Sequence, residues 1–374
     1  MRFFNRVGTN VLLSGDAGTN WSSIYTTINS ANLILKHTPE ISFTNEATRN
    51  EVMANAYFLR AYCYFTLVRV FGDCPLLTSG FESEKQEDMY PSRTAASEVY
   101  AQVETDIEEA LRLMPASSKL LHKASPAAIN MLRTEYYLWK AKRLGGGNAA
   151  LSTAQSSVDA VLKAGYALLP TFADIFNLNN EANSELIWTL PYIVNENVTP
   201  GTSPNFFAYY LAPNGDRTRL REAGYTEDEV PAGSHAQYVV PTQAYCDFLA
   251  EDARDTRTDV SVRVFEDKFL TEEVQIKRMV VKFKGSFAND TRSFDSDVPV
   301  YRLAEAYLLK AEAENALGNT DAALQNLNVV AKRAYGVDNY YTARTQDAID
   351  NAIISEILKE FVAESKSMVG IPSL

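Results

Sequence analysis

The stretch from residue 50 to residue 78 constrains the fold of this chain more than any other. Its apolar residues recur every three or four positions, which predicts a long helix with one broad buried face. They are Ala54, Tyr57, Phe58, Ala61, Tyr64, Phe65, Val68 and Phe71. Gly72 favours a helix end, and Pro75 prevents the helix from restarting. We therefore expect a buried helix with a fixed C-terminal end, against which other helices pack.

Similar apolar stripes predict further helices on both sides of this stretch. Asn20 is a candidate cap for one of them. Ser125 is followed by proline, and this pair is a start signal for another helix. A last helix opens at Thr345 and runs to about residue 367. A further amphipathic segment ends before Pro115. In chain order the stripes are Trp21, Tyr25, Ile28 and Asn32; Val99, Val103, Ile107, Ala110, Leu111 and Met114; Met131, Leu132, Tyr136 and Leu138; and Ile349, Ile353, Ile357 and Phe361.

Two segments repeat one pattern. The runs Tyr137-Leu-Trp-Lys-Ala141 and Tyr307-Leu-Leu-Lys-Ala311 share their spacing, and each is followed by a glycine turn and by a helix that begins Ala-Ala-Leu. A helix, a glycine turn and an alanine-led helix are typical of tetratricopeptide-like repeats. We therefore expect a mostly α fold, an α-α superhelix of tetratricopeptide-like helical repeats that is interrupted by loops.

Residues 171–299 show a different pattern. Residues 186–190 and 279–283 predict short strands, and between them residues 195–241 contain Pro, Gly, Asn and Ser without a helical period. Long loops in compact proteins are usually functional or disordered. Helical signals return at residues 242–250 and fully from Val300. We expect one domain over residues 1–374, with N-terminal helical repeats at 20–170, a loop-rich insertion with a few short strands at 171–299, and shortened C-terminal repeats at 300–374.

Composition and missing motifs argue against several classes of protein. The net charge of −12 argues against nucleic-acid binding, because phosphates would be repelled. No apolar run is long enough to span a bilayer. The three Cys and three His residues lack the spacing of a metal site or a disulfide framework, and no nucleotide-binding or hydrolase motif occurs. We therefore expect no metal and no cofactor.

The densest acidic cluster lies at residues 251–259. Paired carboxylates can carry acid/base chemistry, which makes this cluster the first place to look for catalysis. However, Arg254 and Arg257 alternate with its carboxylates, which indicates solvated or salt-bridged charge. The carboxylates are Glu251, Asp252, Asp255 and Asp259. We assign no catalytic residue to this chain and expect it not to be an enzyme.

Two stretches resemble the signature sequences of a known family. The first runs Phe58-Leu-Arg-Ala61, Tyr64-Phe65 and Phe71-Gly-Asp-Cys-Pro-Leu76, and the second runs from Asp297 through Arg302 and Glu305 to Ala313. Over nearly its whole length the chain resembles the SusD/RagB family, outer-membrane glycan-binding lipoproteins of the Bacteroidetes. The resemblance implies a non-enzymatic nutrient-binding protein at the cell surface. Such a protein binds glycans or oligosaccharides and delivers them to a SusC-like, TonB-dependent outer-membrane transporter.

The ends of the chain depart from the family pattern. Family members carry a signal peptide and a lipidated Cys, and the sequence MRFFNRVGTNVLLSG contains neither. In the family the last helix leads into a Glu-Gly-x-Arg segment, whereas Glu364-Ser-Lys366 stands here and the chain stops at Leu374. We expect a mature, trimmed or incomplete chain, held at the membrane only through a lipid anchor that is not in this sequence.

The loop-rich insertion contains the best candidates for sugar contacts. Sugar rings stack their apolar faces on aromatic side chains, while amide and charged groups bind their hydroxyls. Phe206 and Phe207 could instead fix the loop to the core, and that interpretation stays open. Secondary candidates are the loop at residues 287–294 and, near the N-terminus, Asn10, Asp16 and Asn20. The predicted ligand-binding residues are Phe206, Phe207, Tyr209, Tyr210, Asn214, Asp216 and Arg217.

Alternatives from other functional classes stay open. A tetratricopeptide-type interaction scaffold that binds a peptide would need basic clamp residues in the repeat groove, and the acidic chain has few. A peptide-binding nutrient receptor is a further alternative, since some members of the family are thought to take up peptides. A glycoside hydrolase of the helical-toroid kind would need two dedicated carboxylates in a cleft and would release reducing ends.

Overall fold

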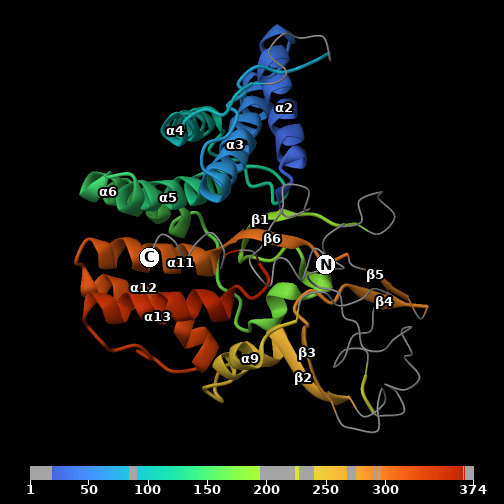
Figure 1. Cartoon of the computed structure of the whole chain (residues 1–374), viewed down its shortest axis with the longest axis vertical. Coiled ribbons are helices and arrows are strands. Elements are labelled where there is room, and N and C mark those ends of the chain that lie inside the picture. Colours follow the sequence, from blue (N-terminus) through green and yellow to red (C-terminus); the bar gives the residue numbers. More distant parts are fainter. Residues whose placement is uncertain are drawn as a thin grey trace. The chain divides into compact units, whose positions relative to one another are not determined.

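The computed structural model describes residues 19–83, 91–193, 224–226, 240–267, 275–289, 291–293, 295–364 and 366. They belong to two compact units, Met1–Gly165 and Tyr166–Pro372, whose elements are labelled in Figure 1. Most elements are helices and the strands are short, so the predicted mostly α fold is confirmed. Among the described helices, none is both long enough and apolar enough to cross a membrane.

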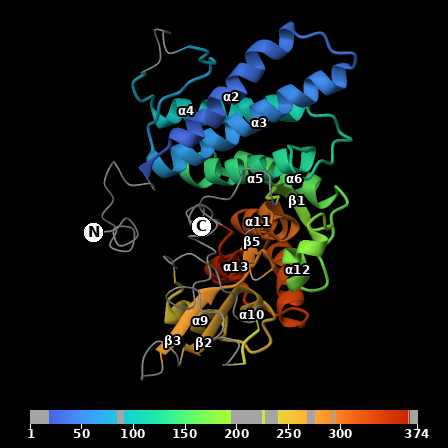
Figure 2. The ribbon, with the colours of Figure 1, turned by 90° about the vertical axis from the view of Figure 1, so that its right-hand side faces the viewer.

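The N-terminal unit consists of helices that pack against their neighbours in the chain. α2 (Ser22–His37) packs on α3 (Glu46–Phe71), α3 on α4 (Ala96–Leu113), α4 on α5 (Pro126–Arg143) and α5 on α6 (Gly147–Leu162). A 3-10 helix, η2 (Thr38–Glu40), follows α2. Figure 2 shows this succession, which is the neighbour-to-neighbour packing of helical-repeat proteins.

α3 is the buried helix that the sequence predicts. It begins before residue 50, because Asn45 caps it by accepting a 2.8 Å hydrogen bond from the Ala47 N–H. Of the predicted stripe, Tyr57 and Phe71 are half-buried and the other members are buried. Gly72 ends the helix at φ +68°, a conformation that side chains disfavour. The predicted burial and the predicted end are therefore both confirmed.

The stripe of α2 packs against the segment that follows α3. The Tyr25 hydroxyl donates to the Pro75 carbonyl (2.7 Å), and the buried Asn32 amide donates to the Leu77 carbonyl (2.9 Å). The Trp21 ring lies edge-on to a neighbouring phenyl ring of α3, with 5.2 Å between centroids. These residues therefore belong to the core packing, as the sequence predicts.

The C-terminal unit combines short antiparallel strand pairs with three long helices in its described residues. β1 (Leu186–Leu190) pairs with β6 (Val298–Arg302), β2 (Val262–Asp267) with β3 (Gln275–Val280), and β4 (Ser286–Ala288) with β5 (Thr291–Ser293). The short helices are η3 (Ala173–Phe176), η4 (Leu178–Asn180), α9 (Gln243–Leu249) and α10 (Thr258–Ser261). The long helices are α11 (Leu303–Ala316), α12 (Thr320–Tyr335) and α13 (Gln346–Glu360).

The long helices α11, α12 and α13 enclose an apolar core, and Figure 1 shows them side by side. Leu308, Leu327 and Ile353, one from each helix, are at most 1% exposed. Gly318, at φ +81°, makes the turn between α11 and α12. The predicted sequence of helix, glycine turn and alanine-led helix is confirmed here.

Three predicted boundaries are wrong. Residues 300–302 are strand, not helix, because β6 pairs with β1 and α11 begins only at Leu303. The strand predicted at residues 279–283 ends at Val280. The last helix ends at Glu360, because the turn after it buries Glu364 among cations. In the first and third cases, partners far along the chain set the boundary.

Candidate functional site

The predicted ligand-binding residues lie outside the described residues, so their role stays a prediction. This applies to Phe206, Phe207, Tyr209, Tyr210, Asn214, Asp216 and Arg217, and also to Asn10 and Asp16. Of the secondary candidates, Asn20 accepts a hydrogen bond from the Ser22 N–H at the start of α2. Phe287 is half-buried on β4.

Aromatic side chains are all at least partly buried wherever the structure describes them. Tyr225, close in sequence to the predicted loop, has its ring centroid 5.9 Å from that of Phe265. A sugar-stacking platform needs ring faces that are open to solvent. The described aromatics therefore do not form such a platform by themselves.

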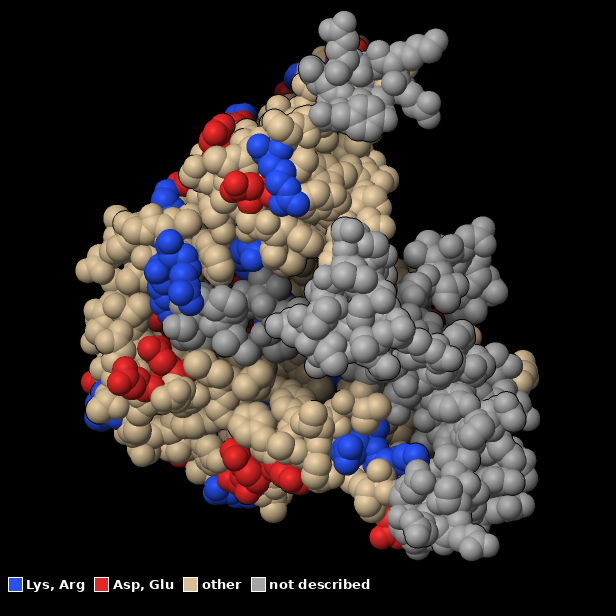
Figure 3. All heavy atoms as spheres, viewed as in Figure 1, with Lys and Arg blue, Asp and Glu red and all other residues tan. Residues whose placement is uncertain are grey.

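Charged side chains are dispersed over the face drawn in Figure 3. Lys and Arg, like Asp and Glu, occur there in small groups separated by uncharged surface. On the coloured part of that face there is no continuous basic stripe of the kind that follows a nucleic-acid backbone.

The acidic cluster at residues 251–259 is salt-bridged, as the alternating arginines predict. Asp252 pairs with Arg254 at the surface (2.6 Å), and Asp255 pairs with Arg257 in the interior (2.8 Å). Hydrogen bonds from Arg254 hold the pKa of the Asp252 carboxyl well below its usual range. A carboxylate that is kept ionised in this way is a poor proton donor, so the contacts favour a structural role.

A buried ion network runs through the interior of the C-terminal unit. Each of its side chains is at most 5% exposed. The cations and the carboxylates come from segments that are far apart in sequence. Some lie in β6, α12, α13 and the turn after α13, and the others lie just before β1, next to α10 and just after β3. Its members are Glu185, Asp255, Arg257, Lys282, Arg302, Arg333, Glu356, Lys359, Glu360 and Glu364.

Two arginines make most of the contacts in the buried ion network. Arg302 donates to Glu185 (3.2 Å), to Glu360 (2.5 Å) and to Glu364 (2.8 Å). Arg257 donates to two carboxylates of α13 at 2.7 Å and 3.0 Å, in addition to its partner in the 251–259 cluster. Bidentate and shared contacts of this kind suit the planar guanidinium group. The network therefore links α13 to β6 through Arg302 and to the start of α10 through Arg257.

The pKa values of two buried carboxyls follow from these contacts. Burial alone would raise the pKa of Glu360, but Arg333, Arg302 and Arg257 outweigh burial and hold that pKa well below its usual range. For Glu364 the opposing cations are Arg302 and Lys282, and its pKa is likewise lowered. Both side chains are therefore ionised at neutral pH, and their charge is part of the folded structure.

Lys282 supplies the most buried ammonium group of the network. Its Nζ donates to the Glu360 carbonyl (2.8 Å) and to the Glu364 carboxylate, and it lies 4.5 Å from the Phe176 ring centroid. Burial lowers the pKa of Lys282 to about 8, although Glu364 opposes the shift. The geometry holds this lysine between a carboxylate and aromatic rings, which is a structural position.

We expect Glu364→Gln to reduce the sensitivity of the C-terminal unit to acid. The folded pKa of Glu364 lies below its usual 4.5, so its charge stabilises the fold above pH 4.5 and that stabilisation is lost as the pH falls through the folded pKa. Gln lacks this charge at every pH. The difference in unfolding free energy between wild type and variant should therefore be largest near about pH 7 and should shrink towards about pH 3.

Urea unfolding over this pH range measures the effect. Trp188, 4% exposed, reports on the C-terminal unit once Trp21 and Trp139 of the other unit are replaced by Phe. A difference that stays constant with pH would contradict the assigned role of Glu364.

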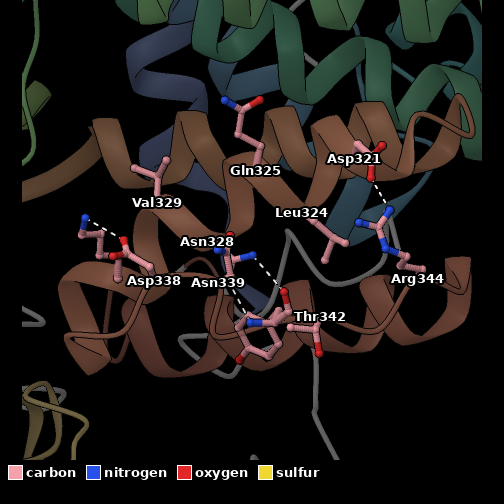
Figure 4. A pocket seen from close by; sticks show the side chains of 11 residues that line it. Asp321, Leu324, Gln325, Asn328, Val329, Asp338, Asn339, Thr342 and Arg344 are labelled. Carbon is pink, nitrogen blue, oxygen red and sulfur yellow. Dashed lines mark hydrogen bonds and ion pairs between the residues drawn. The ribbon is translucent and has the colours of Figure 1, made fainter.

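A pocket of about 560 Å³ lies between α12 and the segment that joins α12 to α13. Figure 4 shows Asp321 and Arg344 at one end and Asp338 towards the other, with Leu324 and Asn328 between them. This volume is within the range of small-molecule sites. Neither here nor elsewhere do the described residues form a cluster of His, Cys, Asp and Glu that could hold a metal ion. The lining offers amides, a hydroxyl and paired charges, which suits a neutral polar ligand.

Comparison with protein families decides the identity of the chain. Residues 5–137 match the family model described as starch-binding associating with outer membrane, and residues 268–369 match the model of the SusD family. Both signature stretches lie within these ranges, which together make up more than half of the chain. The chain belongs to the SusD/RagB family. The predicted resemblance is thereby confirmed, and it supports a carbohydrate-binding surface protein.

Similar proteins agree with the SusD/RagB assignment. The chain is 26% identical to SusD-like protein P25 of Formosa agariphila, over 92% of this chain and 67% of that protein. Among solved structures, NanU of B. fragilis has a TM-score of 0.81 at 25% identity, covering 100% of this chain and 80% of that one. A SusD superfamily protein from Bacteroides vulgatus has a TM-score of 0.80 at 27% identity, covering 99% and 82%.

The charged residues in the SusD/RagB signature stretches have structural partners. Arg60, in the first stretch, forms a buried pair with Asp106 (2.6 Å). Arg302, in the second, belongs to the buried ion network, and Glu305 pairs with Lys366 (2.8 Å). The signature therefore specifies the core of the fold in this chain.

Sequence reasoning missed both the pocket and the buried ion network. Asp321, Gln325, Asn328 and Lys332 recur at helical spacing, so a shared face was visible in the sequence. A polar helix face normally indicates exposure to solvent. Only the path of the segment after α12 shows that this face lines a pocket. No local signal marks a charge as buried.

Proposed function

We propose that this chain binds glycans or oligosaccharides at the cell surface and delivers them, with no bond broken, to a SusC-like, TonB-dependent outer-membrane transporter. The observation that carries the proposal is the match of both family models, in chain order, to a chain whose fold follows solved SusD structures over its full length. Binding and hand-over are the roles that the family implies. Attachment to the outer membrane through a lipid anchor is part of the same proposal.

The described carboxylates support a non-enzymatic role. Hydrolysis of a glycosidic bond needs a carboxylic acid and a second carboxylate that face each other across a cleft. The densest acidic clusters here are paired with arginine or lysine instead, and in the interior no room is left for a sugar between them. Their charges are used to hold the fold together.

We further propose that the sugar contacts come from the stretch with Phe206, Phe207, Tyr209 and Tyr210. Aromatic faces stack on the C–H faces of sugar rings, and the nearby Asn214, Asp216 and Arg217 can bind hydroxyls. The proposal rests on this composition, and on the finding that the described aromatics are at least partly buried.

We expect one polysaccharide from a panel of plant, host and microbial polymers to retard the chain in affinity electrophoresis. Changing Phe206, Phe207, Tyr209 and Tyr210 to Ala should weaken binding by more than about tenfold, because each lost ring contact is worth roughly 1 kcal/mol. A matched variant exchanges Phe for Tyr and Tyr for Phe at the same positions. It keeps every ring and should bind like the wild type.

Other outcomes separate the alternatives. Retardation that survives the Ala variant would keep the glycan function and remove the proposed contacts. Reducing ends released from the retarding polymer would overturn the non-enzymatic role. No retardation by any polymer, with the fold intact, would contradict the glycan function and favour a peptide-binding receptor.

A further inference from the structure

The pocket beside α12 is held open by contacts within the protein. The segment that follows α12 contacts this helix at three points, two of which are ion pairs between exposed side chains. Arg344 pairs with Asp321 at one end, and Lys332 pairs with Asp338 at the other (2.7 Å). Between them, the Asn328 amide donates to the backbone carbonyl of the following segment and accepts from its N–H, at 2.9 Å each. The buried Asn328 amide therefore holds the segment against the middle of α12, and a wall that is already ordered lowers the entropic cost of binding.

The wall contributed by Tyr341 is fixed from behind. Its hydroxyl donates to Glu356 of the buried ion network (2.8 Å), and its ring packs edge-on against Tyr340, 4.9 Å between centroids. Asn328 is 8% exposed and Leu324 is 7% exposed, so the floor is also part of the folded core. The floor and one wall of this surface pocket are therefore held in place by the folded core, while Gln325 and Thr342 are exposed at its opening.

The chemistry of the pocket favours a neutral ligand that is rich in hydroxyls. Its acidic and basic groups are already paired with each other at the two ends, so a charged ligand would have to break a pair. The two bonds of Asn328 use one N–H and one lone pair of the amide, which leaves one of each. Gln325 and Thr342 also line the pocket, and neither bonds to another described side chain. Amides and hydroxyls that can both donate and accept match sugar hydroxyls.

We propose that the α12 pocket is a second binding site for a short neutral oligosaccharide, separate from the predicted loop. This inference rests on the proposed glycan function and extends it. Two sites on one chain would let a long glycan be held at two places, and the second contact would raise the overall affinity through effective concentration.

The test uses oligosaccharides released from the polysaccharide that retards the wild type. The double variant Gln325→Ala, Thr342→Val removes polar groups that have no structural partner in the described residues, so its fold should be intact. Asn351→Ala, an exposed amide on α13 outside the pocket, is the matched control. In the loop-Ala background, we expect the double variant to weaken the residual binding by about fivefold or more and the control to leave it unchanged.

Side-chain amide signals in nuclear magnetic resonance provide a direct readout. Those of Gln325 and Asn328 should shift during the titration in the wild type and in the loop-Ala variant. If a binding glycan shifts neither signal and the double variant binds normally, the pocket proposal is wrong and the glycan function stands. If the wild type binds no glycan at all, both proposals fail. Shifts caused by peptides but not by oligosaccharides would overturn the assigned ligand class.

Discussion

Arg302→Met should destabilise the C-terminal unit by about 3–5 kcal/mol, the typical effect of removing one partner from a buried ion pair. Arg302 is 1% exposed and contacts Glu185, Glu360 and Glu364. Met has a similar length but no charge, so these carboxylates would remain buried with one cation fewer. The missing counter-charge for these carboxylates should lower the free energy of unfolding more than the lost packing does.

Urea unfolding followed by Trp188 fluorescence measures the Arg302 effect, in the background with Phe at positions 21 and 139. The control is Arg344→Met, which removes a guanidinium from a pair whose side chains are 68% and 83% exposed. Exposed pairs contribute about 0–1 kcal/mol, so the control should stay close to wild type. Arg302→Lys keeps the positive charge but lacks the planar, forked guanidinium. Its free energy of unfolding should lie between those of Arg302→Met and Arg344→Met. Equal effects of Arg302→Met and Arg344→Met would refute the account of the network.

Arg60→Met should destabilise the N-terminal unit by about 3 kcal/mol or more. Arg60 holds Asp106 in a bidentate pair at 2.6 and 2.8 Å, donates to Asn32 (2.7 Å), and is 5% exposed, while Asp106 is fully buried. The pair joins α2, α3 and α4, so its loss affects three helices at once. Trp21 and Trp139 report on this unit when Trp188 is replaced by Phe.

A second variant tests the cause of the Arg60 effect. If the cost comes from an uncompensated charge, Arg60→Met combined with Asp106→Leu should recover much of the lost stability, because no charge is then buried. Arg112→Met, on the same helix as Asp106, removes a cation that is 63% exposed and should change the free energy of unfolding by less than about 1 kcal/mol. A double variant less stable than Arg60→Met would show that the hydrogen-bonded geometry itself, and not the charge, is what matters.

Helix positions could be predicted because their signals are local. Ser125 and Thr345, which mark helix starts in the sequence, each cap a helix within one turn, and Gly72 ends one through its own backbone conformation. The start of α3 at Asn45, ahead of the predicted stretch, was missed. Helix and strand boundaries were predicted wrongly where residues far away in the sequence determine them. Val300 lies in a strand because β1, more than a hundred residues earlier, pairs with the β6 residues on both sides of it.

Buried charges could not be predicted for the same reason. In the sequence Arg60 looks like any charged residue on a helix, and its partner Asp106 is 46 positions away. Glu185 and Arg333 are separated by 148 positions. The predicted sugar contacts rest on composition alone, and the α12 pocket depends on the path of a segment whose own sequence has no helical or strand period.

The buried ion network also constrains when the C-terminal unit can fold. Its cations at positions 257, 282, 302 and 333 are synthesised before the carboxylates of α13 and the turn after it, at positions 356, 360 and 364. Until these carboxylates have left the ribosome, burying the earlier segments would place four arginine and lysine cations in an apolar interior with only Glu185 and Asp255 of the network as counter-charges. The nascent C-terminal unit should therefore stay open, and exposed to chaperones and proteases, until residue 364 has emerged from the ribosome.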